Sequence, residues 1–151
     1  MSDDPGYLLD TNTVSDLIRG HTQVSARVRT VPMAQLAISA ITRAELEYGL
    51  CKRPEAVRLR ALVEAFLQRV TVLNWDTQAA LGYGQLRHQL EKKGLVVAPL
   101  DLLIAAQAWS RGAILVSHDQ VFAQVSQHTG LYWQDWRVPA GADFTEVNDK
   151  K

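Results

Sequence analysis

Short apolar runs that each end at a polar residue and lead into a helix constrain the fold of this chain most. Residues 7–9 form such a run, Asp10 ends it, and Val14, Leu17 and Ile18 follow at helical spacing. The runs do not alternate between apolar and polar residues, which is typical of parallel strands covered on both faces. Strands of this kind, alternating with helices, predict an α/β/α sandwich with a central parallel sheet of four to five short strands.

The same patterns place the other elements along the chain. Further strands are expected at residues 36–38, 70–73 and 113–116, with an edge strand at 131–133. Helices are expected at residues 24–31, 42–50, 54–70, 76–94, 99–112 and 122–125. Beyond Arg137 the periodicity is lost, so residues 1–137 are expected to form a single domain and residues 138–151 a flexible C-terminal tail.

Neither a membrane span nor a secretory signal is expected. The apolar stretches fall short of the roughly 18 residues that a span needs. Asp3 and Asp4 lie where a secretory signal carries positive charge, and the single Cys51 cannot form an internal disulfide. We therefore expect a cytoplasmic protein in which Cys51 is a small buried packing residue.

Several acidic residues stand at the starts of expected helices. Taken singly, Asp10, Asp101 and Asp119 are suitable helix N-caps, and Thr42 with Glu45 matches a capping box. However, Asp10 and Asp119 both end apolar strands, so a parallel sheet brings them to the edge where ligands bind. Independent caps need not converge in this way, which favours a shared site.

Glu45 and Asp101 begin helices that can point at the same edge. Two carboxylates about 4 Å apart repel each other by roughly 4 kcal/mol near a protein surface, so a cluster of four needs a cation. Mg²⁺ or Mn²⁺ suits a set of oxygen ligands, and no Cys or His pair has the spacing of a zinc site. Metal-bound water and a carboxylate that takes its proton are the components of phosphodiester hydrolysis.

Four segments of the chain resemble, in order and spacing, the signature segments of PIN-domain VapC toxins. They are LLDTN at residues 8–12, SAITRAELEYG at 39–49, PLDLLIA at 99–105 and VSHDQVF at 116–122. Residues 76–94, 110–112 and 134–136 look most like the enteric branch, which is known for cutting initiator tRNA in its anticodon region. His118 departs from the family pattern, in which Asn is more usual, and is interpreted as a solvent-facing turn residue or an RNA phosphate contact.

The resemblance implies a PIN-like fold and a magnesium-dependent endoribonuclease that inhibits translation as the toxin of a VapBC-type toxin-antitoxin system. It implies that Asp10 and Asp101 are the principal metal ligands and that Glu45 and Asp119 complete the acidic quartet. It also implies that Asn12 and Ser117 orient carboxylates or waters, and that Mn²⁺ can substitute for Mg²⁺. The implied partners are an RNA substrate, a second copy of the chain, and a VapB-like antitoxin that places a basic side chain over the carboxylates.

The charge balance gives a weaker indication of RNA binding. The chain has 16 basic and 16 acidic residues, and neutralising four acids with metal leaves 12 acidic residues and a mildly basic surface. Candidates for phosphate contacts, with a solvated helix face as the alternative, are Arg43, Arg58, Arg60, Arg69, Arg87, Lys92 and Lys93. Trp109 and Trp133 are expected in the core, Tyr48 beside the groove, and Asp16 on the surface.

Two other classes of function remain open. Receiver-like and dehalogenase-like phosphoryl-transfer proteins also place Asp at strand ends. The second class requires an Asp where Asn12 stands, and the first requires a Lys that the residues around Ser117 do not offer. A catalytically silent PIN-like module that binds RNA or protein is the other alternative, although mere binding does not require carboxylates that repel phosphate.

Overall fold

A single parallel sheet organises the molecule, whose computed structural model describes residues 4–139. Within that range five strands, all parallel, lie in the order β3-β2-β1-β4-β5. They are β1 Tyr7–Leu9, β2 Leu36–Ser39, β3 Thr71–Leu73, β4 Ile114–Val116 and β5 Trp133–Gln134. The predicted α/β class and the central sheet of short parallel strands are confirmed.

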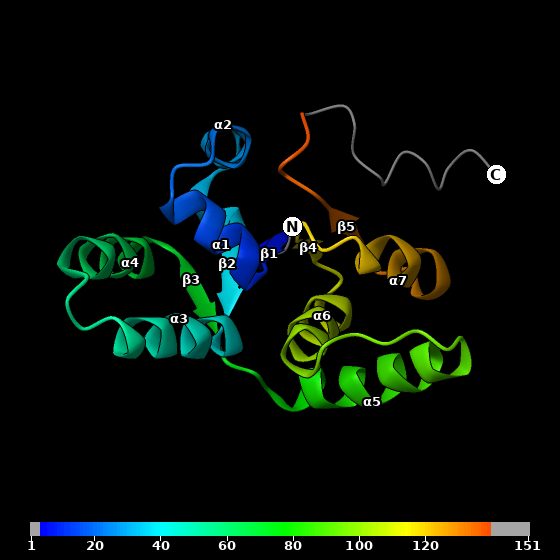
Figure 1. Cartoon of the computed structure of the whole chain (residues 1–151). Coiled ribbons are helices and arrows are strands. Elements are labelled where there is room, and N and C mark those ends of the chain that lie inside the picture. Colours follow the sequence, from blue (N-terminus) through cyan, green and yellow to red (C-terminus); the bar gives the residue numbers. More distant parts are fainter. Residues whose placement is uncertain (1–3, 140–151) are drawn as a thin grey trace.

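Helices cover both faces of the sheet (Figure 1). They are α1 Thr11–Ile18, α2 Thr22–Thr30, α3 Ala40–Lys52, α4 Val57–Arg69, α5 Thr77–Lys92, α6 Pro99–Arg111 and α7 Val121–Thr129, with a 3-10 turn at Met33–Gln35. One core cluster joins the sheet to α1 through α4, and a second joins it to α5 through α7, which gives an α/β/α sandwich. No helix between residues 4 and 139 has the length and hydropathy to cross a bilayer.

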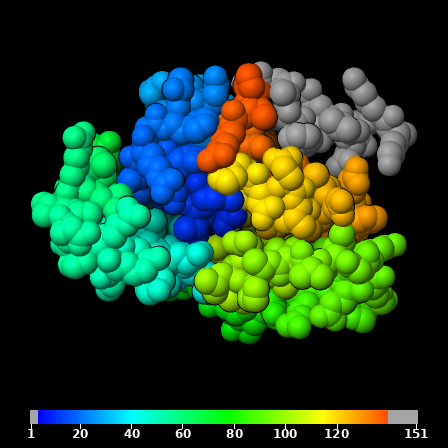
Figure 2. Space-filling model, viewed as in Figure 1, coloured from blue at the N-terminus to red at the C-terminus, as the bar shows by residue number. Residues whose placement is uncertain are grey.

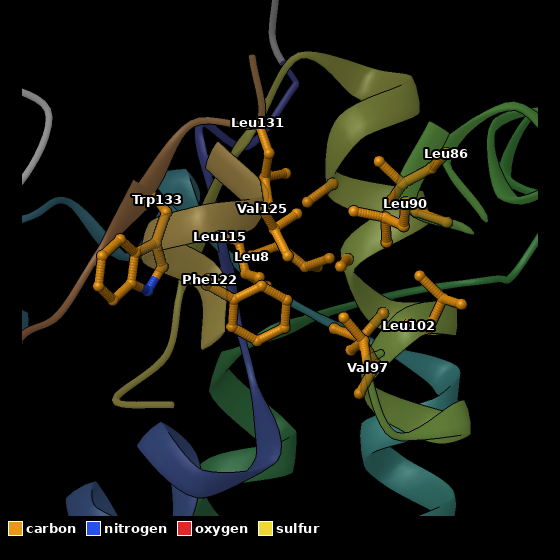
Figure 3. Packing of buried hydrophobic residues seen from close by; sticks show 14 of the residues in the cluster. Leu8, Leu86, Leu90, Val97, Leu102, Leu115, Phe122, Val125, Leu131 and Trp133 are labelled. Atoms are coloured by element: carbon orange, nitrogen blue, oxygen red, sulfur yellow. The ribbon is translucent and has the colours of Figure 1, made fainter. Parts of the chain in front are cut away.

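The core beneath α5, α6 and α7 fixes the loop that follows β4 (Figure 3). Phe122 and Trp133 are almost completely buried there, and each such side chain stabilises the fold by roughly 1.5 to 3 kcal/mol. The indole Nε1 of Trp133 donates to the carbonyl oxygen of Ser117 at 2.9 Å, and that of Trp109 donates to the carbonyl of Thr129 at 3.1 Å. Both tryptophans therefore belong to the core region, as predicted.

The start of α3 differs from the sequence prediction. The helix begins at Ala40 because the hydroxyl oxygen of Ser39 accepts the Ile41 N–H at 3.0 Å and caps it. The capping box predicted for Thr42 and Glu45 is therefore wrong, and Glu45 lies in the second turn of the helix. Thr42 is buried inside that helix.

Two side-chain environments also differ from expectation. Asp16 is only 5% exposed, and the guanidinium of Arg137 donates to its two carboxylate oxygens at 2.7 and 2.8 Å, so the expected surface position is wrong. These bonds lower the pKa of Asp16. Cys51 is exposed rather than buried, because it lies about 100° around α3 from the buried Leu50. Most of the predicted C-terminal tail, residues 140–151, lies outside the described range.

Candidate active site

The carboxyl edge of the sheet holds the polar residues that follow three neighbouring strands. Asp10 follows β1, Ser39 ends β2 and Ser117 follows β4. Because β1 lies between β2 and β4, these segments meet at one place, and the Asp10 N–H donates to the Val116 carbonyl at 2.9 Å. In Figure 2 the dark-blue surface near the start of the chain is bordered by α3 in cyan, α6 in yellow-green and the residues after β4 in yellow.

Asp10 is the most buried of the predicted site residues, with 2% of its surface exposed. One of its carboxylate oxygens accepts the Thr11 N–H at 2.8 Å and the other accepts the Ser117 hydroxyl at 2.9 Å. The pKa of Asp10 is raised to about 6, chiefly by burial and also by the charges of Asp101 and Glu45, while the two hydrogen bonds act in the opposite direction. The Asp10 carboxylate is thus held in place by hydrogen bonds, but these bonds do not offset the effects of burial and of the neighbouring negative charges.

The four predicted acids are linked electrostatically through Asp101. Burial raises the pKa of Asp101, and the charges of Glu45 and Asp119 add to the effect. Asp10 in turn interacts with Asp101 and Glu45. The structure therefore brings residues from the end of β1, from α3, from α6 and from the loop after β4 to the same edge of the sheet.

Thr11 connects two of these acids and was not singled out from the sequence. Its hydroxyl donates to the Glu45 carboxylate at 2.7 Å, while its N–H donates to Asp10. The hydroxyl oxygens of Thr11 and Thr42 lie 3.2 Å apart, so the start of α1 is tied to α3. The only sequence signal for this role is its position between two residues that were singled out, Asp10 and Asn12.

Asn12 and Ser117 form the other half of the hydrogen-bond network. The Asn12 amide donates to the Ser117 hydroxyl oxygen at 3.1 Å, and its carbonyl oxygen accepts the His118 N–H at 3.3 Å. The Ser117 oxygen also accepts the Asp119 N–H at 3.2 Å. Asp119 accepts the Val121 N–H at 3.1 Å, which fixes the carboxylate at the start of α7.

If the chain has the ribonuclease activity that the resemblance implies, replacing Ser117→Ala is expected to lower the rate of RNA cleavage about 10- to 100-fold, in the range seen when the groups that orient metal ligands are removed. The change removes the donor to Asp10 and an acceptor shared by two N–H groups. Steady-state kinetics should show the loss in kcat rather than in KM. Ser110→Ala, which loses only a bond to the Gln107 carbonyl, is the control, and equal kcat for the two variants would contradict this role.

Comparison with known proteins decides the family. The PIN domain family model matches residues 7–127. The tRNA(fMet)-specific endonuclease VapC of Salmonella typhimurium is 36% identical over 130 residues, which cover 86% of this chain and 97% of that protein. The chain belongs to the VapC family of PIN-domain proteins. The VapC of the same description from Shigella flexneri is also 36% identical, over 132 residues.

Solved structures of VapC-containing complexes have the same fold. A chain of the DNA-bound VapBC complex from Salmonella typhimurium superposes with a TM-score of 0.78 at 36% identity, covering 87% of this chain and 98% of that one. A chain of VapBC2 from Rickettsia felis, bound to a promoter DNA fragment, gives a TM-score of 0.75 at 30% identity, with coverages of 86% and 98%. The fold of this chain is thus that of the VapC structures.

The carboxylates of this VapC-family site are oxygen donors, the chemistry that a hard divalent cation prefers. Between residues 4 and 139, no three Asp, Glu, His or Cys side chains are close enough to enclose an ion by themselves. Mg²⁺ suits such an arrangement, because it keeps several waters and binds one or two carboxylates directly. Burial and, to a lesser extent, mutual repulsion raise the pKa of Asp10 and Asp101, and a divalent charge would relieve that repulsion.

The cations proposed for RNA binding lie in different surroundings. The Nε of Arg43 lies 3.8 Å from a carboxylate oxygen of Glu47. The guanidinium of Arg87 donates to the Glu91 carboxylate and to the Tyr83 hydroxyl oxygen, each at 2.9 Å. A guanidinium nitrogen of Arg60 lies 3.9 Å from a carboxylate oxygen of Glu64. These partners support the alternative of a solvated helix face for the paired arginines. The assignment of RNA contacts to Arg43, Arg87, Lys92 and Lys93 stays a prediction.

His118 is less exposed than a solvent-facing turn residue would be. Its side chain is 29% exposed, and its Nε2 lies 3.8 Å from the Asp16 carboxylate. The ring thus faces the pair formed by Asp16 and Arg137. Its backbone N–H, by contrast, donates to the side-chain oxygen of Asn12.

Proposed function

We propose that this protein is a magnesium-dependent endoribonuclease, a phosphodiester hydrolase that acts as the toxin of a VapBC-type system. The observation that carries the proposal is the buried Asp10 carboxylate, whose pKa is raised to about 6 beside Asp101 and Glu45. Burying this carboxylate beside two other acids costs the fold stability unless a cation is bound there. The family supports the same chemistry, since the relatives are named endonucleases and ribonucleases.

The residues of the chain would hold and order the reacting groups. Asp10 and Asp101 would be the principal ligands of Mg²⁺, with Glu45 and Asp119 completing the site, and Mn²⁺ can substitute. The bound ion supplies an acidified water and charge stabilisation for the phosphoryl transition state. Ser117 and Thr11 fix the oxygens of Asp10 through hydrogen bonds, and Thr11 also fixes Glu45. One of the four carboxylates would accept the proton of the attacking water.

We propose tRNA as the substrate, and initiator tRNA cut in its anticodon region as the specific target. The support is that two relatives, each 36% identical to this chain, are named tRNA(fMet)-specific endonucleases. Cleavage there removes the tRNA with which translation starts. The enzyme would then act in the cytoplasm, where that substrate is found.

We propose a VapB-like antitoxin as the physiological partner and a homodimer as the form of the toxin. The partner is supported by the VapBC complexes among the similar solved structures. A guanidinium from the antitoxin can form two charge-assisted hydrogen bonds with carboxylates, which replaces the charge of the metal. Inhibition and catalysis would therefore compete for the same oxygens.

The direct test uses the purified protein with total tRNA. Cleavage is expected with Mg²⁺ or Mn²⁺ and should fall to background with EDTA, because the four acids then repel both each other and the phosphate. Sequencing the cut ends after induction in cells should map them to the initiator anticodon region. Cuts scattered over messenger RNA would contradict the target. RNA binding without cleavage under any divalent ion would instead indicate a silent PIN-like module.

A further inference from the structure

A pocket of about 300 Å³ opens beside the acidic site, between α1, α3 and α4. Thr11 and Glu45 form its side nearest the site. Its apolar lining is provided by Ile18, Leu46, Leu50, Leu59 and Val63. The size is at the lower end of pockets that bind small organic groups, and an apolar lining with a few polar groups is typical of them.

Three cations surround this pocket, and none was singled out from the sequence. Arg19 follows α1, Lys52 ends α3 and Arg53 follows it, and all three side chains are exposed. No carboxylate between residues 4 and 139 forms an ion pair with them, whereas Arg43, Arg60 and Arg87 each have an acidic partner. Basic residues are favourable at helix ends, but this preference does not explain why three of them converge on one pocket.

An exposed aromatic residue lies along α3 between the acidic site and these cations. Glu45, Tyr48 and Lys52 are spaced three and four residues apart, so they share one face of the helix. Tyr48 is 64% exposed, and the Lys52 ammonium lies 4.7 Å from the centre of its ring. Exposed aromatic rings interleaved with cations are typical of surfaces that bind single-stranded nucleic acid.

We propose that this pocket binds the RNA strand next to the scissile phosphate. One base enters the apolar lining, the adjoining phosphates contact Arg19, Lys52 and Arg53, and a neighbouring base stacks on Tyr48. The positive charge without acidic partners complements an RNA backbone, and Glu45 makes the pocket continuous with the carboxylates. The inference rests on the proposed ribonuclease function and adds the path of the substrate.

The test measures RNA affinity in an Asp10→Asn background, in which bound RNA is not cut. Binding of a labelled single-stranded anticodon-loop oligoribonucleotide is followed by fluorescence anisotropy between 50 and 200 mM salt. Lys52→Ala/Arg53→Ala is expected to weaken binding about 10-fold and to reduce the salt slope by about 1, as expected when up to two phosphate contacts are lost from a single strand. Tyr48→Leu is expected to weaken binding about 10-fold, and Tyr48→Phe to retain it, because stacking needs only the ring.

Arg29→Ala is the control. Arg29 is exposed and lies in the segment leading into β2, toward the opposite edge of the sheet from the acids. A Lys52/Arg53 double variant that kept the affinity and salt slope of Arg29→Ala would overturn the pocket proposal. So would a Lys52/Arg53 variant that binds RNA normally but is no longer neutralised by the antitoxin, because the pocket would then be a protein-docking site.

The two proposals can fail separately. If the wild-type protein fails to cleave RNA with Mg²⁺ or Mn²⁺, the ribonuclease function is wrong, while the anisotropy series still decides whether the pocket binds RNA. If the wild-type protein cleaves and the pocket variants bind normally, the function stands and the substrate path is wrong.

Discussion

Asp10→Asn is expected to reduce RNA cleavage about 10³-fold or more and to leave the fold intact, since it removes a negative ligand from the centre of the acidic cluster. The amide has almost the shape of the carboxylate and retains an oxygen to accept the Thr11 N–H. Single-turnover cleavage of tRNA at saturating Mg²⁺ measures the effect. Circular dichroism and gel filtration should match those of the wild-type protein.

Asp76→Asn supplies the control for this substitution. Asp76 also caps a helix, with its carboxylate accepting the Ala79 N–H at 2.9 Å, but it belongs to α5 rather than to the acidic cluster. Its variant should cleave at the wild-type rate. Wild-type cleavage by Asp10→Asn, or a comparable loss in Asp76→Asn, would show that the carboxylate charge at Asp10 is not what the reaction requires.

The metal-free protein is expected to lose about 2 to 3 kcal/mol of unfolding free energy between pH 4 and pH 7 because of Asp10. The pKa of this group is raised from 3.8 to about 6 in the folded state, so over this interval the folded chain binds more protons than the unfolded chain. Stability from this group therefore falls as the pH rises through about 6. The raised pKa of Asp101 acts in the same direction.

Urea unfolding in EDTA at a series of pH values measures this dependence. In Asp10→Asn the profile should be flatter, and Mg²⁺ should restore stability to the wild-type protein at pH 7 by binding only the folded state. A metal-free wild-type protein whose unfolding free energy rises between pH 5 and 7 more steeply than that of the variant would contradict the electrostatic account of the site.

The fold could be predicted from the sequence because its strands and helix starts are marked by short, local patterns of residues. Each buried parallel strand is a short apolar run, and each run is followed by a polar residue that begins the next element. Because parallel strands end at the same edge of a sheet, Asp10 after β1 and Asp119 after β4 could be predicted to lie at one edge. The order of the strands itself decides which of these ends are neighbours, and here β1 is central.

The errors arose where two local signals competed or where a distant residue decided the outcome. Ser39 and Thr42 are both suitable N-caps for α3. Ser39 caps the helix because β2 ends there and its hydroxyl oxygen accepts the Ile41 N–H. Asp16 reads as a surface residue because its partner, Arg137, lies 121 positions away. A charged side chain can be buried only with such a partner, and spacing along a helix does not show it.

The pocket beside Glu45 could not be predicted for a similar reason. Its wall is formed by three helices whose crossing depends on side-chain packing, and the cations around it come from the ends of α1 and α3. The basic residues that the sequence emphasised lie on regular helical faces, where an acidic residue four positions later pairs with several of them.

The central place of β1 has a consequence for the time at which the protein becomes dangerous to the cell that makes it. The Asp10 carboxylate receives its hydrogen bond from Ser117, 107 positions later in the chain, and β1 pairs with β4. A ribosome must therefore finish most of the polypeptide before the pieces of the site can assemble, because contacts this distant form only after the intervening segments are available. A nascent chain that stops before α6 carries neither Asp101 nor Asp119, so abortive synthesis leaves the acidic cluster incomplete.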